Sequence, residues 1–150
     1  MTEEYNLIKI ERKLGKELDG YRYRHTLGVM YMAAALAMRY DITLLQNAQV
    51  AGLLHDCAKG IPNDKKIKMC EKRGIEITLI ERKNPSLLHA KLGAALAKEK
   101  YGVSDPDILG AIRWHTTGKA DMSMLEKIIF IADYIEPMRD KARSLSVVRE

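Results

Sequence analysis

The stretch AGLLHDCAKG, residues 51–60, places a histidine and an aspartate side by side at the end of an apolar run. The hydrophobic pattern before His55 and Asp56 predicts that the chain enters a core at this point. Burying titratable side chains without partners costs free energy. The doublet therefore predicts that other polar groups, or a bound cation, meet it inside the protein.

The composition of the chain is that of one globular domain. It has 150 residues, 47% of them hydrophobic and 30% charged, so we expect a single domain over residues 1–150. No apolar run approaches the roughly 20 residues needed to cross a bilayer, and the amino-terminal stretch MTEEYNLIKIERK lacks the apolar region of a secretory signal. Cys57 and Cys70 fit no disulfide or CxxC spacing. These features predict a cytoplasmic protein with no membrane partner.

The charge pattern gives little support for a nucleic-acid partner. The formal net charge is +5, which suits an anionic ligand. The charged runs NDKKIKMCEKR and LIERK mix both signs, as solvated helix faces do. We therefore expect no nucleic-acid partner.

Helical periodicity runs through the whole chain and predicts an all-α fold. Apolar residues recur at spacings of three and four, and glycine or proline stands at most of the breaks. Ser104 with Asp107, and Ser123 with Glu126, have the spacing of a capping box. The expected helices cover about residues 4–18, 24–40, 43–58, 63–73, 85–101, 105–115 and 123–136, with a weak tail after Pro137.

All four histidines fall on or beside core-facing stripes of different predicted helices. For a single histidine, a buried imidazole bonded to a backbone carbonyl is an ordinary alternative, but four such residues in one core make that reading strained. Asp133, in IIFIADYIEP, adds a carboxylate on an apolar face, where pairing or a cation is needed. Asp56 is rotated by only about 100° from its neighbour on a helix, so both can converge on one point. The sequence therefore predicts a buried metal. The four histidines are His25, His55, His89 and His115.

The order of these residues resembles a known family. His25, the doublet and Asp133 form the pattern H…HD…D, which resembles the HD-domain metal-dependent phosphohydrolases. His89 and His115 match the branch of that family that carries two metals. The flanking words RHTLGV, GLLHDCAKG, LLHAKLGA, RWHTTG and IADYIEPMR resemble the symmetrical diadenosine tetraphosphate hydrolases of the YqeK family, across roughly residues 20–140.

The resemblance implies a helical HD-domain bundle with a buried site for two metal ions. It favours iron, although mixed imidazole and carboxylate ligands also suit manganese or zinc. It implies hydrolysis of a dinucleoside polyphosphate into two nucleoside diphosphates by a hydroxide that bridges the metals, with Asp56 in a catalytic, bridging role. One ion would be held by His25, His55, Asp56 and Asp133, and the other by Asp56, His89 and His115.

Five further residues are expected to contact the substrate. Lys59, one turn after the doublet, can offset charge on the phosphoryl group, unless it is an ordinary surface lysine. The resemblance places Arg139 near the phosphates, the alternative being a surface arginine at a helix end. The turn HTTG offers the hydroxyls of Thr116 and Thr117 and the backbone of Gly118 to a phosphate, or it is a plain turn.

Other functions share the same ligands and stay open. They are another HD-domain nucleotide phosphohydrolase or phosphodiesterase, a di-iron oxygenase, and a metal-binding or nucleotide-binding module without turnover. The flanking sequence segments favour the dinucleoside polyphosphate hydrolase, with a nucleotide as its partner. The sequence does not choose the metal, the preferred base or the oligomeric state, so a homodimer remains open. Members of the family usually continue beyond SLSVVRE, and we expect this chain to lack a C-terminal helical segment.

Overall fold

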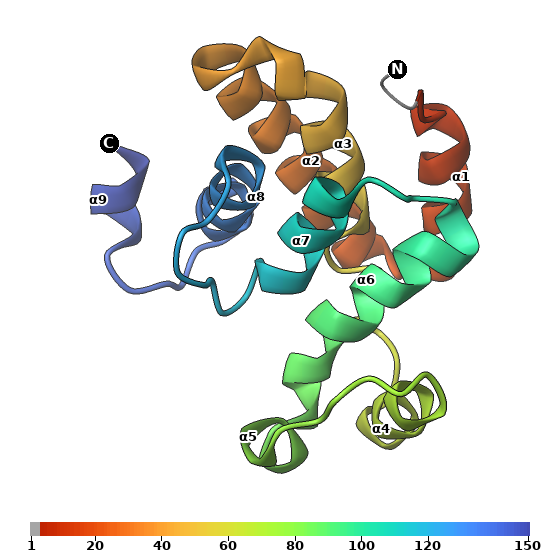
Figure 1. Cartoon of the computed structure of the whole chain (residues 1–150). Helices are drawn as coiled ribbons and strands as arrows, with labels where there is room; N and C mark the ends of the chain where they lie inside the picture. Colours follow the sequence, from red (N-terminus) through yellow and green to blue (C-terminus); the bar gives the residue numbers. More distant parts are fainter. Residues whose placement is uncertain (1–3) are drawn as a thin grey trace.

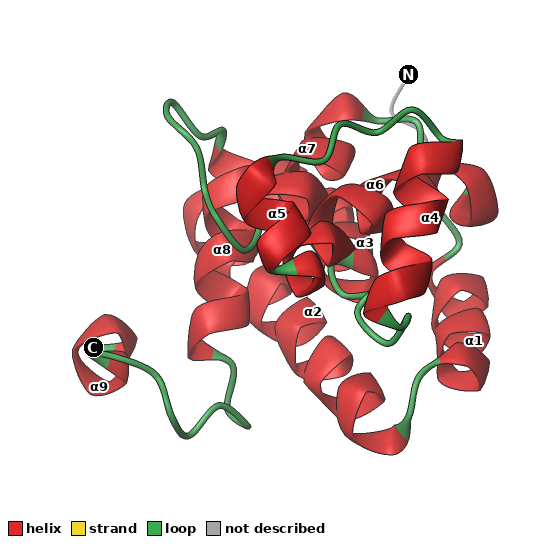
Figure 2. Cartoon of the chain, turned by 90° about the horizontal axis from the view of Figure 1, so that it is seen from below, coloured by secondary structure: helices red, strands yellow, loops and turns green. Residues whose placement is uncertain are grey.

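The structure, a computed structural model of the chain, describes residues 4–150, and these form helices and turns without a strand (Figures 1 and 2). The first three residues of the polar amino-terminal stretch lie outside the described residues. The all-α prediction is confirmed. None of the described helices combines the length and apolar character needed to cross a membrane. The elements are α1 (Leu7–Glu17), α2 (Gly20–Tyr40), η1 (Ile42–Leu44), α3 (Leu45–Leu54), α4 (Asn63–Lys72), α5 (Leu79–Lys83), η2 (Pro85–Leu87), α6 (Leu88–Tyr101), α7 (Pro106–Trp114), α8 (Met124–Ile135) and α9 (Leu145–Arg149).

The main core lies between α2, α3, α7 and α8, with α1 and the end of α6 against it (Figure 1). Helices α2 and α3 approach each other closely at Gly52. A β-carbon at this position would lie 2.8 Å from Cα of Met30, a distance that real β-carbons do not adopt next to backbone. Only glycine therefore lets α3 pack this closely on α2.

A smaller core lies where α4 and η2 cover the first half of α6. Figure 1 shows α6 leading from the main bundle to α4 and α5. Lys91 on α6 is buried, and its ammonium group bonds Glu81 Oε1 at 2.9 Å and the carbonyl of Glu76 at 2.8 Å. Because a buried charge is tolerated only with such partners, this pair fixes α5 against α6. The run LIERK, expected to form a solvated helix face, is α5 itself.

The capping-box prediction is confirmed for α8 and wrong for α7. At the start of α8, Ser123 and Glu126 form the reciprocal pair of bonds. At the start of α7, the cap is Asp105, whose side chain accepts the N–H of Asp107, and Pro106 occupies the first helical position. The Asp105 carboxylate accepts a free N–H of the first turn, and Pro106 has no N–H to satisfy. The N-cap of α7 is therefore Asp105 and not Ser104.

The second helix begins four residues earlier than expected. Asp19 caps it by accepting the N–H of Arg22 at 2.9 Å, and Gly20 is its first residue. The side chain of Asp19 also pairs with the guanidinium of Arg22 at 3.2 Å. The added turn carries Arg22 onto the same helix as His25.

The third helix ends at Leu54, so the prediction of a helix through residue 58 was wrong. His55 keeps right-handed helical angles, but residues 55–60 form turns with bonds between residues three apart, such as Lys59 N–H to Asp56 O at 3.0 Å. The imidazole of His55 donates to the carbonyl of Gly52 at 2.7 Å, which satisfies one of the free carbonyls at the helix end. The doublet of His55 and Asp56 therefore lies directly after the C-terminal end of α3.

Candidate metal centre

Five helices bring polar side chains to one point. The end of α3, the start of α6 and the end of α7 supply buried side chains, and α2 and α8 supply partly buried ones. The structure thus brings together all six residues expected as metal ligands. They are His25 on α2, His55 and Asp56 after α3, His89 on α6, His115 after α7, and Asp133 on α8.

The six side chains form two groups of three, and Asp56 of one group lies next to the histidines of the other. His25, His55 and Asp133 offer ligand atoms that lie within 4.8 Å of one another, and so do Asp56, His89 and His115. The Oδ1 atom of Asp56 lies 3.4 Å from His89 Nε2 and 3.3 Å from His115 Nε2. Its Oδ2 atom lies 3.5 Å from His55 Nε2 and 3.7 Å from His25 Nε2. Each carboxylate oxygen of Asp56 therefore faces one group.

Every imidazole in the cluster turns its Nε2 atom inward because Nδ1 is held from behind. An N–H at Nδ1 donates to a carboxylate or a backbone carbonyl, which leaves the lone pair of Nε2 for the centre when the ring is neutral. Metal-binding histidines in proteins are oriented in this way. The acceptors are Glu136 Oε1 for His25 (2.8 Å), Gly52 O for His55 (2.7 Å), Ser86 O for His89 (2.6 Å) and Ile112 O for His115 (2.7 Å).

Two buried atoms at the centre test whether the residues fit a metal ion. His55 Nε2 and Asp56 Oδ1 are buried and have no hydrogen-bond partner among the residues that the structure describes. Such atoms are costly when they are left unsatisfied. When the ring of His55 is neutral, both atoms carry lone pairs, and one cation can accept both. The residues present therefore fit a metal-binding cluster.

Burial and charge oppose each other within the cluster. Burial alone would lower the pKa of His55, but the carboxylates of Asp56 and Asp133 raise it to about 9. Burial lowers the pKa of His89 to about 4, although Asp56 acts in the opposite direction. Burial would raise the pKa of Asp56, yet the neighbouring histidines, His55 foremost, hold it well below the usual range. Asp56 is therefore ionised at neutral pH, as a metal ligand must be.

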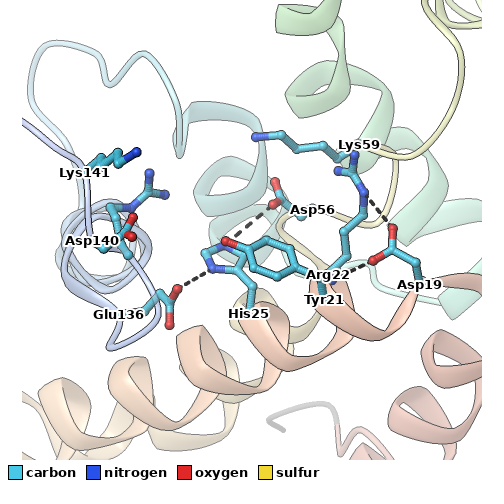
Figure 3. A pocket seen from close by; sticks show the side chains of 10 residues that line it. Asp19, Tyr21, Arg22, His25, Asp56, Lys59, Glu136, Asp140 and Lys141 are labelled. Atoms are coloured by element: carbon cyan, nitrogen blue, oxygen red, sulfur yellow. Dashed lines mark hydrogen bonds and ion pairs between the residues drawn. The ribbon is translucent and has the colours of Figure 1, made fainter.

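A pocket of about 620 Å³ opens above His25 and Asp56. Figure 3 shows Lys59 and Arg22 on one side of it and Asp140 and Lys141 on the other. The lining holds four lysine or arginine side chains and four carboxylates, but two of the carboxylates, Asp56 and Glu136, are buried. The lining side chains that are not buried therefore carry an excess of positive charge, which suits an anionic ligand. The lining residues are Asp19, Tyr21, Arg22, His25, Asp56, Lys59, Glu136, Arg139, Asp140 and Lys141.

Lys59 and Arg139, both expected near the substrate, line this pocket. Lys59 stands on the turn that follows α3, and its side chain is exposed. The guanidinium of Arg139 donates to Asp133 at the backbone carbonyl (3.1 Å) and at Oδ1 (3.3 Å). Arg139 therefore supports a candidate ligand as well as the pocket, and its contact with phosphate stays a prediction.

The HTTG turn lies beside the cluster but outside the residues that line the pocket. Thr116 Oγ1 lies 3.3 Å from His89 Nε2. The hydroxyl of Thr117 donates to the carbonyl of Gly118, and the N–H of Gly118 donates to the carbonyl of Trp114 at 2.9 Å. Gly118 therefore has no free N–H for a phosphate, because the turn uses it. Binding by Thr116 and Thr117 stays a prediction.

Two residues of the site were missed in the sequence. Glu136 is buried and accepts the Nδ1–H of His25, and Arg22 lines the pocket. Glu136 follows Asp133 by three positions, and Arg22 precedes His25 by three. Because residues three apart share a helix face, the spacing on α2 was the signal that could have found Arg22. Glu136 lies beyond the end of α8, so helical spacing gives no such signal for it.

Comparisons with known proteins agree with the geometry. The sequence model of the HD domain matches residues 22–138. The chain is 40% identical over 136 residues to a protein of Bacillus subtilis (strain 168) named "Bis(5'-nucleosyl)-tetraphosphatase, symmetrical", with 87% of this chain and 72% of that protein covered. It is 46% identical over 123 residues to a protein of the same name from Halalkalibacterium halodurans, and the match covers 81% of this chain and 64% of that one. The chain thus spans about two thirds of the length of these relatives.

A solved structure shares the fold. It is described as a "predicted HD superfamily hydrolase involved in NAD metabolism" from Clostridium acetobutylicum. The two superpose with a TM-score of 0.88 at 44% sequence identity, over 98% of this chain and 77% of the other. The likeness covers every element that contributes a side chain to the cluster.

Proposed function

The chain belongs to the HD domain family, and from that premise we propose that it is a metal-dependent hydrolase that cleaves dinucleoside tetraphosphates symmetrically into two nucleoside diphosphates. Two relatives at 40 and 46% identity carry the name of that activity. The observation that carries the proposal is Asp56, whose two oxygens face separate groups of histidines at the floor of a basic pocket. That arrangement suits two cations next to a polyphosphate.

We propose that two metal ions bind the cluster, with Asp56 shared between them. His25, His55 and Asp133 would complete one site, and His89 and His115 the other. Iron is the first candidate, and manganese and zinc fit the same donor set. When bound, such ions supply Lewis acidity at the phosphoryl oxygens and a water that ionises near neutral pH. Metal analysis of purified protein identifies the ions.

The basic side chains of the pocket would hold and orient the polyphosphate. Lys59 and Lys141 stand on opposite sides of the pocket (Figure 3), so phosphates between them meet positive charge from two directions. Arg22 is held in place by its ion pair with Asp19. Charge-assisted bonds of this kind bind phosphate oxygens strongly, and fixed orientation lowers the barrier to the reaction.

Symmetrical cleavage follows if the pocket grips one nucleoside diphosphate unit. Its terminal phosphorus would then lie over the metal cluster, and the other nucleoside diphosphate would depart. The two inner phosphorus atoms of diadenosine tetraphosphate are equivalent, so attack on either gives two molecules of ADP. Attack on an outer phosphorus gives AMP and ATP instead.

Product chromatography of diadenosine tetraphosphate with the fully metallated protein tests the proposal. We expect ADP as the only early product, and ADP should inhibit competitively because it is one half of the substrate. In heavy-oxygen water, one label should enter the terminal phosphate of one ADP per turnover. Formation of AMP and ATP, or no reaction with diadenosine tetraphosphate while a different nucleotide is hydrolysed, would redirect the assignment to a different phosphohydrolase.

A further inference from the structure

We infer that Glu136 is a positioning residue that orients His25 for metal binding, and that Gly28 is glycine because Glu136 occupies the space of its side chain. The inference rests on the proposed metal site. It concerns two residues that are not among the six ligands. Both lie within the matched region of the chain, at the border between α2 and the end of α8.

Pro137 turns the chain at Glu136. A residue before proline avoids the helical region, and Glu136 has φ −55° and ψ 147°, so α8 ends at Ile135. The extended backbone at this position takes the side chain off the helical path. Its Oε1 atom accepts the Nδ1–H of His25 at 2.8 Å.

The other bonds of Glu136 leave Oε1 to His25. The Oε2 atom accepts the N–H of Met138 at 2.8 Å, and the backbone carbonyl accepts from Arg149 at 2.8 Å and from the N–H of Arg139 at 3.0 Å. The side chain is only 2% exposed, so water does not compete for it. A buried carboxylate held on one oxygen by backbone presents the other in a fixed direction.

Gly28 provides the space for this carboxylate. It follows His25 by three positions on α2, so the two share a helix face. A β-carbon on Gly28 would lie 2.9 Å from Glu136 Oε2 and 3.7 Å from Cδ. Any larger residue at position 28 would displace the carboxylate from its bond to Met138 and from His25. Figure 3 shows Glu136 reaching His25 from the side of the pocket opposite Lys59.

The consequence for His25 is a fixed tautomer and a fixed ring plane. With its proton at Nδ1, the neutral ring points the Nε2 lone pair at the cluster, where Nε2 lies 3.0 Å from Asp133 Oδ1. A carboxylate behind a histidine ligand also makes the ring a stronger base. Glu136 therefore acts on the metal through His25 alone.

Two variants separate positioning from a role in stability. Glu136→Gln removes the charge, and its amide cannot accept from both Met138 and His25. Gly28→Ala keeps the carboxylate but moves it. The matched control is Gly20→Ala on the same helix, because a β-carbon at Gly20 would meet nothing within 4 Å. The probe is Zn²⁺, titrated into each full-length protein in competition with a chromophoric chelator and without nucleotide.

We expect Glu136→Gln and Gly28→Ala to bind one of the two zinc ions about 10- to 100-fold more weakly, with the other ion and the control unchanged. In long-range proton–nitrogen NMR spectra of the zinc-loaded protein, the Nδ1–H signal of His25 should be sharp and downfield in the wild type. It should move upfield or broaden in both variants.

Unchanged affinity for both ions together with a wild-type His25 signal would overturn the inference. Equal weakening of both ions would also overturn it, since the hydrogen bond from the Glu136 side chain to the cluster goes to His25. The zinc titrations contain no nucleotide, so they test this inference independently of the proposed function. If the variants bind zinc as expected but the wild-type protein does not cleave diadenosine tetraphosphate, the proposed function is refuted and this inference stands.

Discussion

The Nε2 atoms of His89 and His115 face each other at 3.1 Å, and each ring uses its Nδ1–H on a backbone carbonyl. When both rings are neutral, no hydrogen lies between the two nitrogens. Asp56 Oδ1 lies 3.4 and 3.3 Å from the same atoms, so three electron-rich atoms meet at one point. Packing of α6 against α7 holds them there, and a cation converts their repulsion into attraction.

Metal binding should therefore stabilise the fold. A ligand that binds only the native state raises the free energy of unfolding by RT ln(1 + [L]/Kd), which is about 2.7 kcal/mol at 100 times Kd. We expect excess Zn²⁺ or Mn²⁺ to raise the melting temperature of chelator-treated protein, as measured by calorimetry. The variant Asp56→Asn, which weakens both groups, should lose most of this increase. A melting temperature that does not respond to metal would argue against the centre.

The metal-free protein should lose stability as the pH falls from about 6.5 to about 4. Burial lowers the pKa of His89 to about 4, so the unfolded chain takes up this proton first and acidification favours unfolding. The full cost over that interval is about 3 kcal/mol. Urea unfolding at several pH values in the presence of chelator measures it, and His89→Gln should flatten the curve in this window.

His55 should contribute with the opposite sign in the same metal-free protein. Its carboxylate neighbours raise its pKa to about 9 against the burial effect. The stabilisation is complete below about pH 6.5, the unfolded value, and is lost as the pH rises through about 9. The pH of maximum stability should thus lie between the windows of the two histidines. A stability curve that keeps rising above pH 9 in chelator would contradict this assignment.

Gly52→Ala should affect both the fold and the metal centre. The new β-carbon would meet the backbone of Met30 at 2.8 Å, and backbone cannot rotate away as a side chain can. We expect a loss of about 1–3 kcal/mol in the free energy of unfolding, as for other overpacked sites. The carbonyl of Gly52 also holds His55 Nδ1, so zinc affinity should fall as well. Gly60→Ala, with nothing within 4 Å of its β-carbon, is the control.

The residues that the sequence could reveal are those whose chemistry conflicts with their surroundings. His25, His89, His115 and Asp133 stand on apolar faces of helices, and the structure brings all of them to one point. The periodicity of apolar residues shows which face of a helix is turned to the core. A polar residue on that face can therefore be recognised before the fold is known. The cluster of polar side chains and the all-α architecture were predictable for that reason.

The parts that could not be predicted depend on contacts between distant elements. At the end of α3, after Leu54, the side chain of His55 bonds the carbonyl of Gly52. The periodicity of apolar residues cannot predict that a side chain will cap its own helix. The distance between Gly28 and Glu136 links positions 108 residues apart. Likewise, the N–H of Gly118 donates to the carbonyl of Trp114, a bond that the sequence does not predict. Local sequence determines the helices, and tertiary packing determines which of their polar groups remain free.

Lys59→Ala should lower the turnover number without removing the metal. The backbone of Lys59 is tied to the turn by its N–H to Asp56 O at 3.0 Å and by the ammonium of Lys66 to its carbonyl at 3.3 Å, so truncation leaves the turn in place. The exposed head group lines the pocket beside Asp56, where it can meet the charge that develops on the phosphoryl group. Loss of such a contact costs about 10²-fold in kcat. Steady-state kinetics with diadenosine tetraphosphate, alongside metal analysis, measures both quantities. Lys65→Ala, an exposed lysine outside this pocket, should turn over as the wild type does. If Lys59→Ala does the same, the lysine acts only at the surface, and the positive charge that the reaction needs must come from Arg22, Arg139 or Lys141.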